Sequence, residues 1–204
     1  MEVKNTKIKI CGLTRPEDIE AVNQLLPDYI GFVFWKKSRR NIEPQKAKEL
    51  KGMLDSRMKA VGVFLDAEIE LVINLLKEGV IDIAQLHGSE DEEYINKVKA
   101  ETGREVIKAF NVNKIPSLSV AEESSADYIM LDSGTGSGKA FDLSLLSEVK
   151  RPFFLAGGLS PDNVEAAIGE VHPYAVDVSS GVESGGFKDP EKMKCFVEKA
   201  RHIK

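Results

Sequence analysis

Short apolar runs alternate along this chain with longer amphipathic runs, in which apolar positions recur every three or four residues. The short runs are rich in β-branched and aromatic residues and predict strands, whereas the longer runs predict helices. Strands are expected at residues 7–10, 29–34, 60–65, 83–86, 105–110, 127–131, 152–156 and 174–178. Helices are expected at residues 14–26, 43–54, 67–79, 89–103, 160–171 and 189–204. Strands that alternate with helices in this way predict a parallel sheet.

Capping signals mark two of these helices. Thr14 is the expected N-cap of the first helix, with Pro16 in its first turn. Ser160 is the expected N-cap of the helix in "SPDNVEAAIGEV", with Pro161 at the first helical position. Residues 111–126 have poor periodicity, and we expect them to be largely loop.

The strand-plus-helix unit repeats at an even spacing along the 204 residues. Eight such units favour an α/β fold of the closed (β/α)8 type, a TIM barrel with minimal loops. An open, doubly wound sheet is the alternative. No linker or change in composition divides the chain, so residues 1–204 are expected to form one barrel domain.

Composition limits the binding partners and the cellular location that we expect for this protein. Hydrophobic residues make up 42% and charged residues 30% of the chain, as in ordinary globular proteins. The net charge is −5, and Lys and Arg are spread along the chain, which disfavours a nucleic-acid partner. No apolar run reaches the length of a membrane span, and the polar N-terminus is unlike a signal peptide. Cys11 and Cys195 match no metal-ligand spacing, so we expect reduced thiols in a cytoplasmic protein and no metal site.

Candidate acid–base chemistry lies where two of the predicted strands end. In a (β/α)8 barrel, the carboxyl ends of the strands hold the active site. Alternation places Cys11 and Asp132 on the inner faces of the first and sixth strands, with Lys9 on the same face as Cys11. A thiol and a carboxyl can act as base and acid if the site shifts both pKa values toward neutrality. Each residue alone is more simply a packing residue, since an isolated buried cysteine is usually inert.

The last two loops predict a phosphate site. Gly157 and Gly158 follow the seventh strand in "LAGGLSPDNV", and Ser179 and Ser180 follow the eighth in "VDVSSGVE". Glycine allows a close approach of the backbone, and barrels of this class commonly hold phosphate in these two loops. Ordinary tight turns are the other interpretation.

The glycine-rich segment "SGTGSGKAFD", residues 133–142, is not a nucleotide-binding P-loop. Ser133 stands where the first glycine is required, and Ala140 follows Lys139 where Ser or Thr is required. The segment is suited to closing over a substrate, or it is a surface linker.

Three further sets of residues are candidates. One arginine of "WKKSRRN", which contains Arg39 and Arg40, could bind a carboxylate in bidentate fashion. His87 in "QLHG" is a candidate acid or base. Lys9 and Lys108 are either Schiff-base lysines or buried lysines paired with carboxylates.

Several segments in order resemble the phosphoribosylanthranilate isomerase family of tryptophan biosynthesis. They are "KICGLT", "GFVFWKKSRR", "VGVF", "QLHGSE", "IKAF", "LDS…GSGKAFD", "AGGLSPDNV" and "AVDVSSGVE…G.KD". The resemblance implies a small (β/α)8 barrel that needs neither metal nor cofactor. It also implies a small phosphorylated substrate, N-(5-phosphoribosyl)anthranilate, converted by an Amadori rearrangement to 1-(2-carboxyphenylamino)-1-deoxyribulose 5-phosphate. Whether the chain is a monomer or a homodimer stays open.

The resemblance also implies roles for particular residues. Asp132 is the expected general acid, Cys11 the general base and Arg40 the contact of the anthranilate carboxylate. Gly157, Gly158, Ser179 and Ser180 match the phosphate site, and Asp177 lies where a sugar hydroxyl contact is expected. Asn41 and Leu143 depart from the residues usual in the family at those positions.

Three other functions are alternatives. A related histidine-pathway isomerase is expected to use two carboxylates, but the first strand here ends in cysteine. A lyase would use Lys108 as a Schiff-base nucleophile. A phosphometabolite-binding protein without catalysis would use the same anion-binding loops.

Overall fold

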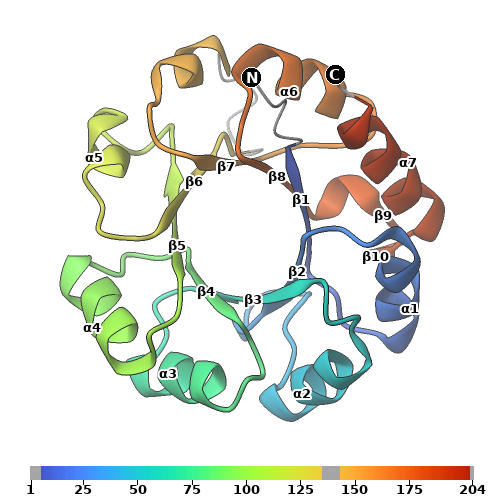
Figure 1. The fold of residues 1–204 in the computed structure, drawn as a ribbon, viewed down its shortest axis with the longest axis horizontal. Coiled ribbons are helices and arrows are strands. Elements are labelled where there is room, and N and C mark those ends of the chain that lie inside the picture. Colours follow the sequence, from blue (N-terminus) through green and yellow to red (C-terminus); the bar gives the residue numbers. More distant parts are fainter. Residues whose placement is uncertain (1–5, 135–142, 203–204) are drawn as a thin grey trace.

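The computed structural model describes residues 6–134 and 143–202, and its eight parallel strands close into a barrel surrounded by helices (Figure 1). The strands are β1 (Lys7–Cys11), β2 (Tyr29–Val33), β3 (Lys59–Phe64), β4 (Ile83–Leu86), β5 (Val106–Asn111), β6 (Tyr128–Asp132), β7 (Phe153–Ala156) and β8 (Ala175–Val178). β8 pairs with β1 in parallel, with Lys9 beside Asp177, and this pairing closes the ring. The predicted (β/α)8 barrel is therefore confirmed.

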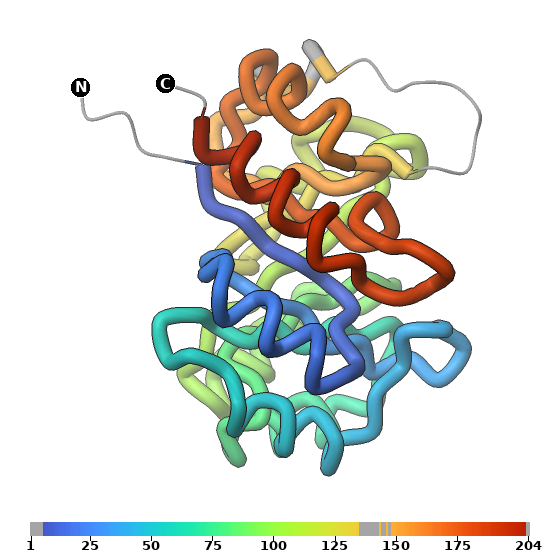
Figure 2. Tube along the Cα trace, turned by 90° about the vertical axis from the view of Figure 1, so that its right-hand side faces the viewer, coloured from blue at the N-terminus to red at the C-terminus, as the bar shows by residue number. Residues whose placement is uncertain are grey.

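Helices cover the outside of the barrel. They are α1 (Pro16–Leu25), α2 (Pro44–Met53), α3 (Ile69–Lys77), α4 (Glu92–Thr102), α6 (Val164–Val171) and α7 (Pro190–Arg201). α7 packs against α1 and β1, so the last helix lies beside the first strand (Figure 2). Among the helices of the described residues, none has both the length and the apolar character needed to cross a membrane.

Two units are irregular. The segment after β5 contains only the short α5 (Ser119–Glu122), as its poor periodicity predicted, and β6 is followed by the 3-10 helix η1 (Leu143–Glu148). Between β8 and α7 lie the 3-10 helix η2 (Ser180–Val182) and a hairpin of β9 (Glu183–Ser184) and β10 (Phe187–Lys188). This hairpin carries charged side chains toward the loop after β2.

Both predicted N-caps are wrong. Arg15 is the N-cap of α1, and the carboxylate of Asp18 accepts hydrogen bonds from the backbone N–H groups of Thr14 and Arg15 at 2.9 and 3.0 Å. The Asp18 carboxylate thus binds the backbone just before α1, and Thr14 lies one residue before the N-cap. α6 begins only at Val164, because the residues that follow Ser160 form a turn closed by a bond from Val164 N–H to Ser160 O at 3.1 Å.

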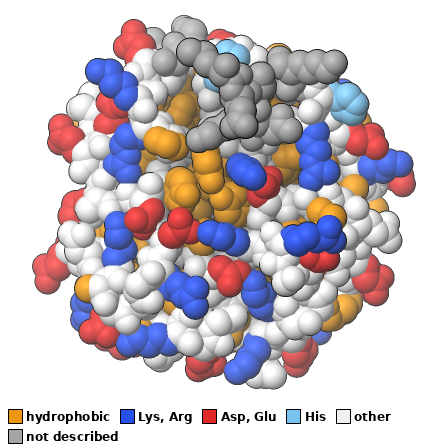
Figure 3. Space-filling model, in the orientation of Figure 1, with side chains coloured by type: hydrophobic (Ala, Val, Ile, Leu, Met, Phe, Trp, Pro, Cys, Tyr) orange, Lys and Arg blue, Asp and Glu red, His pale blue; other side chains and the backbone are white. Residues whose placement is uncertain are grey.

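Side chains of the strands alternate between two apolar layers. Ile8 and Ile10 of β1 belong to the large outer layer under the helices, as do Ile129 and Leu131 of β6. The inner layer fills the barrel and consists of Tyr29, Val61, Ile83, Ile107, Ala109, Met130, Phe154, Ala156 and Ala175. Burying both faces explains why the strands are apolar almost throughout. The view down the barrel shows hydrophobic side chains at the centre of the ring and charged side chains around them (Figure 3).

Four aromatic side chains close the amino-terminal end of the barrel. Tyr29, Tyr128, Phe154 and Tyr174, here called the aromatic floor, lie with ring centroids 5.1 to 5.7 Å apart in the pairs that contact. The hydroxyls of Tyr29 and Tyr174 are 3.0 Å apart and share a hydrogen bond. Since these rings fill one end of the barrel, a ligand enters the interior from the carboxyl-terminal end.

Candidate active site

A cavity of about 220 Å3 lies at the carboxyl ends of the strands. It is lined by Cys11, Val63, Gln85, His87, Asp132, Gly134, residues 156–159, Asp177, Ser179 and Ser180. Of the candidate residues named from the sequence, eight line this cavity and four do not: the eight are Cys11, His87, Asp132, Gly157, Gly158, Asp177, Ser179 and Ser180, and the four are Lys9, Arg39, Arg40 and Lys108. The lining residues come from β1, β3, β4, β6, β7 and β8 and from the loops after β4, β6, β7 and β8, so the barrel brings distant parts of the sequence together.

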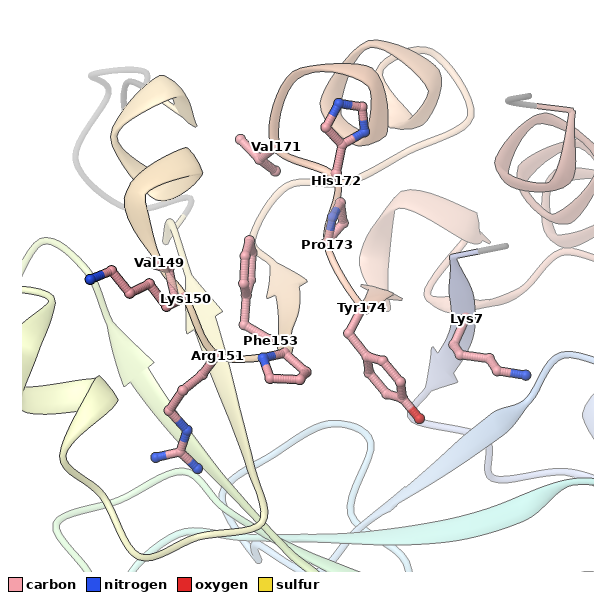
Figure 4. A pocket seen from close by; sticks show the side chains of 10 residues that line it. Lys7, Val149, Lys150, Arg151, Phe153, Val171, His172, Pro173 and Tyr174 are labelled. Carbon is pink, nitrogen blue, oxygen red and sulfur yellow. The ribbon is translucent and has the colours of Figure 1, made fainter. Parts of the chain in front are cut away.

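A larger cavity, of about 660 Å3, lies at the opposite end of the barrel. Lys7, residues 149–153 and residues 171–174 line it, and their side chains spread around the amino-terminal ends of β7 and β8 (Figure 4). No carboxylate occurs among the described residues that line it, so it offers no paired acid and base. The candidate acid and base, Asp132 and Cys11, therefore line the smaller of these two cavities.

Cys11 lies at the end of β1 with its thiol packed against Gly31 of β2. A Cβ atom on Gly31 would lie only 2.7 Å from Cys11 Sγ, so this close approach requires glycine. Cys11 is a free thiol and is buried. Burial raises the pKa of this thiol above its ordinary value, although Lys9 and Lys188 act in the opposite direction.

Asp132 lies across the cavity from Cys11 and is held by two donors. Its Oδ1 accepts a hydrogen bond from Gly134 N–H at 2.8 Å, and its Oδ2 is 3.4 Å from His87 Nε2. Burial opposes the charge of this carboxyl, but His87 and the Gly134 N–H outweigh it, and the pKa of Asp132 lies below its ordinary value. The amide Nε2 of Gln85 lies 3.3 Å from His87 Nδ1, so it contacts the imidazole on the side opposite Asp132. Gln85 was not among the site residues predicted from the sequence.

The loops after β7 and β8 lie against the strands that carry Asp132 and Cys11. Gly157 has φ of +99°, and a Cβ there would lie 2.6 Å from Asp132 Oδ1. Only glycine therefore fits between this loop and the carboxylate. Ser179 Oγ donates to the carbonyl oxygen of Cys11 at 3.0 Å. The two predicted phosphate loops thus flank the same cavity as Cys11 and Asp132.

Arg40 lies beside the cavity in a cluster of charges that the sequence did not predict. Its Nε and Nη2 donate to the two carboxylate oxygens of Glu183 at 2.6 and 2.9 Å. Lys188 Nζ donates to the same carboxylate at 2.7 Å, and Arg39 also binds it. Burial favours the neutral acid, but the bonds from Arg40 and Lys188 lower the pKa of Glu183 to about 2. The Nε–Nη2 edge of Arg40 is therefore occupied by Glu183.

Three cations and one carboxylate leave this cluster, Arg39, Arg40, Glu183 and Lys188, with a net positive charge. Such a cluster attracts an anionic group of a ligand. Glu183 and Lys188 occur in the segment "VSSGVE…G.KD", and that motif was the available signal for them. The contacts of Glu183 with Arg39 and Arg40 could not be predicted, because the β9–β10 hairpin and the loop after β2 are far apart in the sequence.

Lys9 and Lys108 are both paired with carboxylates. Lys9 Nζ donates to Asp177 Oδ1 at 2.8 Å, and Lys108 Nζ donates to Glu90 Oε2 at 2.8 Å and to the Gly88 carbonyl oxygen at 2.7 Å. The paired interpretation of these lysines is the one that the structure shows. Asp177, the predicted sugar contact, lines the cavity and also neutralises Lys9.

Two further expectations concern a lid and a metal. The glycine-rich segment at residues 133–142 lies outside the described residues except for Ser133 and Gly134. Within the described part of the chain, no three His, Cys, Asp or Glu side chains are arranged to hold a metal ion.

Comparison with known proteins gives a consistent set of similarities. The family model described as N-(5'-phosphoribosyl)anthranilate (PRA) isomerase matches residues 8–199. The N-(5'-phosphoribosyl)anthranilate isomerase of Clostridium kluyveri is 47% identical over 201 residues, which cover 97% of this chain and 99% of the relative. Among solved structures, phosphoribosyl anthranilate isomerase from Thermus thermophilus has a TM-score of 0.87 and 34% identity, covering 98% of this chain and 100% of that one.

A second solved structure contains a ligand. It is phosphoribosyl anthranilate isomerase in complex with reduced 1-(o-carboxyphenylamino)-1-deoxyribulose 5-phosphate. Its TM-score to this chain is 0.82 with 36% identity, and the match covers 96% of this chain and 98% of that one.

Proposed function

This chain belongs to the phosphoribosylanthranilate isomerase family, and we propose that it performs the family's reaction with Cys11 as general base and Asp132 as general acid. The enzyme converts N-(5'-phosphoribosyl)anthranilate to 1-(2-carboxyphenylamino)-1-deoxyribulose 5-phosphate in tryptophan biosynthesis. Substrate and product have the same composition, because an aldose derivative becomes a ketose derivative. The reaction therefore requires no external oxidant or reductant, and its proton transfers can be carried out by side chains.

Ring opening is the first step. Asp132 donates a proton to the ring oxygen of the ribose as the bond between that oxygen and C1 breaks, and the anilino nitrogen forms a C=N bond to C1. In the substrate-free protein the Asp132 carboxyl holds its proton weakly. His87 lies within reach of this carboxyl, with its Nε2 3.4 Å from Asp132 Oδ2. We assign His87 this supporting role.

Proton abstraction is the second step. The Cys11 thiolate removes the proton from C2, the C1–C2 bond becomes a double bond, and the C=N electrons return to nitrogen. The resulting enolamine then loses its C2 hydroxyl proton and gains a proton at C1, which leaves the ketone at C2 and the amine at C1. Each of these transfers moves one proton, which is the work of a general acid and a general base.

The two anionic ends of the substrate have separate candidate partners. The loops at Gly157, Gly158, Ser179 and Ser180 are proposed to hold the phosphate, because both line the cavity. The anthranilate carboxylate is proposed to bind Arg40, which belongs to a cluster with net positive charge. Asp177 is proposed to accept a hydrogen bond from a sugar hydroxyl, as its place in the cavity allows.

The observation that carries this proposal is the presence of Cys11 and Asp132 in the same cavity, from β1 and β6. A histidine-pathway isomerase would need a carboxylate in place of the thiol. A Schiff-base lyase would need Lys108 in the cavity, but that lysine is buried and paired with Glu90. Neither alternative has an observation in its favour.

The test is the isomerisation of N-(5'-phosphoribosyl)anthranilate by the purified chain, followed by the fluorescence of the anthranilate adduct. We expect turnover by the wild type, and a fall in kcat of about 10²- to 10⁴-fold in Cys11→Ala and in Asp132→Asn, because each removes one proton-transfer group. Both variants should still bind a reduced product analogue. Full turnover by either variant would remove that residue from the mechanism, and wild-type binding without turnover would indicate a binding protein.

The proposed site is complete within one chain, so a monomer and a homodimer would each carry a full site per chain. A reduced thiol is required at Cys11, and the cytoplasm keeps thiols reduced. We therefore propose a cytoplasmic enzyme.

A further inference from the structure

The proposed base faces an unfavourable environment. Cys11 is only 7% exposed, and burial raises the pKa of its thiol. A neutral thiol is a poor base, since the thiolate is the form that accepts a proton. Something in the site must therefore favour the thiolate if Cys11 is to act.

Lys9 is placed to do this. It lies two residues before Cys11 on the inner face of β1, and its side chain is fully buried, with 0% exposed. Side chains two apart on a strand are neighbours on the same face. The Lys9 ammonium binds Asp177 at 2.8 Å, and Asp177 lines the cavity together with Cys11. The ammonium group therefore lies at the level of the cavity, beside the thiol.

The charge of Lys9 is maintained by Asp177. Burial opposes a positive charge on this lysine, but Asp177 and Cys11 outweigh burial, and the pKa of Lys9 lies above its ordinary value. The register of β1 and β8 places Lys9 directly beside Asp177, so this pairing is built into the barrel. An ammonium that stays charged next to a thiol favours the thiolate.

Other charged groups also face Cys11. Lys188 of β10 is 4% exposed and favours the thiolate, while Asp177 of β8 opposes it. Arg40, after β2, also interacts with Cys11. Lys188 and Arg40 share the carboxylate of Glu183, which neutralises part of their charge. Of all these groups, Lys9 has the largest favourable effect on the thiolate.

We propose that Lys9 is a positioning residue that stabilises the thiolate of Cys11, and that Asp177 holds Lys9 in the charged state that this requires. The inference rests on the proposed role of Cys11 as base. It assigns a chemical task to a buried ion pair that would otherwise be only part of the barrel interior.

The experiment measures ionisation of Cys11 without substrate. In a Cys195→Ser background, the rate of alkylation of Cys11 by iodoacetamide is followed by mass spectrometry across about pH 6 to 10. Lys9→Met is expected to move the midpoint of this profile upward by about one to two pH units, as the loss of a nearby opposite charge does. The kcat of the same variant should fall at neutral pH and recover at alkaline pH, with KM little changed.

A second variant is needed because Lys9→Met leaves the largely buried carboxylate of Asp177 without its partner, and the protein could then fail to fold. Lys9→Met/Asp177→Asn removes both charges. Its alkylation midpoint should lie between those of Lys9→Met and the wild type, because Asp177 opposes the thiolate and its removal partly compensates. The matched control is Lys108→Met/Glu90→Gln, which removes the buried pair of β5 and should leave the Cys11 profile unchanged.

Two results would decide against the assignments. An alkylation profile of Cys11 that is the same in both Lys9 variants as in the wild type would make the Lys9–Asp177 pair purely structural and overturn this inference. A shifted profile with unchanged isomerisation would instead contradict the role of Cys11 as base, which is the proposed function.

Discussion

Glu183 binds Arg40 at two points, with Oε1 accepting from Nε at 2.6 Å and Oε2 accepting from Nη2 at 2.9 Å. This contact fixes the plane of the guanidinium group before any substrate arrives. A substrate carboxylate that reaches Arg40 must then approach from the Nη1 side. The bidentate contact expected from the sequence is thus made by the protein's own carboxylate.

Arg40→Ala should chiefly raise KM. Loss of one charge-assisted hydrogen bond to the anthranilate carboxylate costs about 1.5 to 3 kcal/mol, or roughly 10- to 100-fold in KM, with kcat changed little. Steady-state kinetics measure both. Arg39→Ala is the control, because Arg39 binds the same Glu183 but its side chain is 59% exposed. An unchanged KM in Arg40→Ala would place the carboxylate contact elsewhere.

Gly31→Ala should impair both stability and catalysis. The new Cβ would lie 2.7 Å from Cys11 Sγ and 3.0 Å from Cys11 Cα, so the Cys11 thiol, the proposed base, must move. Overpacking of this kind costs about 1 to 3 kcal/mol of the free energy of unfolding. Urea denaturation and kcat report the two effects.

The control for this variant is Gly169→Ala. Gly169 lies in α6, where an added Cβ meets nothing within 4 Å. That variant should keep its activity and gain slightly in stability, because alanine favours a helix over glycine. Wild-type kcat in Gly31→Ala would show that the position of the thiol is not critical.

His87→Gln should lower kcat at neutral pH by about 10- to 100-fold and leave KM little changed. The physical reason is the loss of the imidazole 3.4 Å from Asp132 Oδ2, which is the proposed proton source, while glutamine keeps a hydrogen-bonding amide in the site. His172→Gln is the matched control, because His172 is exposed at the opposite end of the barrel. Equal kcat for His87→Gln and the wild type would exclude His87 from the supply of protons to Asp132.

Glu183 should stabilise the fold at neutral pH and lose this effect in acid. Its pKa in the folded protein is about 2, against an ordinary value of 4.5, so the native state favours its ionised form. The stabilisation is complete above the ordinary value and disappears as the pH falls through the folded value. The difference in unfolding free energy between the wild type and Glu183→Gln should therefore shrink from pH 5 to pH 2.

Urea denaturation at several pH values measures this difference. Glu49→Gln is the control, because Glu49 is a surface carboxylate whose side chain is 53% exposed. Its small effect should change little over the same range. A constant difference for Glu183→Gln would contradict the strong pairing with Arg40 and Lys188.

The sequence predicted the barrel and most of the cavity because both depend on local regularities. Alternation along β1 and β6 is enough to place Cys11 and Met130 inside and Ile8 and Ile129 outside, and parallel strands bring their carboxyl ends together. Glycine and serine after β7 and β8 are likewise local signals.

The missed features depend on contacts between distant segments. Glu183 and Arg40 are 143 positions apart in the sequence and meet through the β9–β10 hairpin. No periodic pattern in the sequence predicts such a contact. The N-cap of α1 was misplaced because Asp18, inside the helix, accepts hydrogen bonds from the backbone N–H groups of Thr14 and Arg15 and so holds Thr14 outside the helix. The hydrogen bonds of the Asp18 carboxylate therefore determine where α1 begins.

The aromatic floor has a consequence for turnover. Tyr29, Tyr128, Phe154 and Tyr174 close the amino-terminal end of the barrel, so the cavity at the carboxyl-terminal end does not continue through the barrel interior. Substrate and product must then pass through the same mouth in turn, and a departing ketose delays the next aldose. We therefore expect accumulated product to compete with substrate for the carboxyl-terminal mouth, because the opposite end of the barrel is closed.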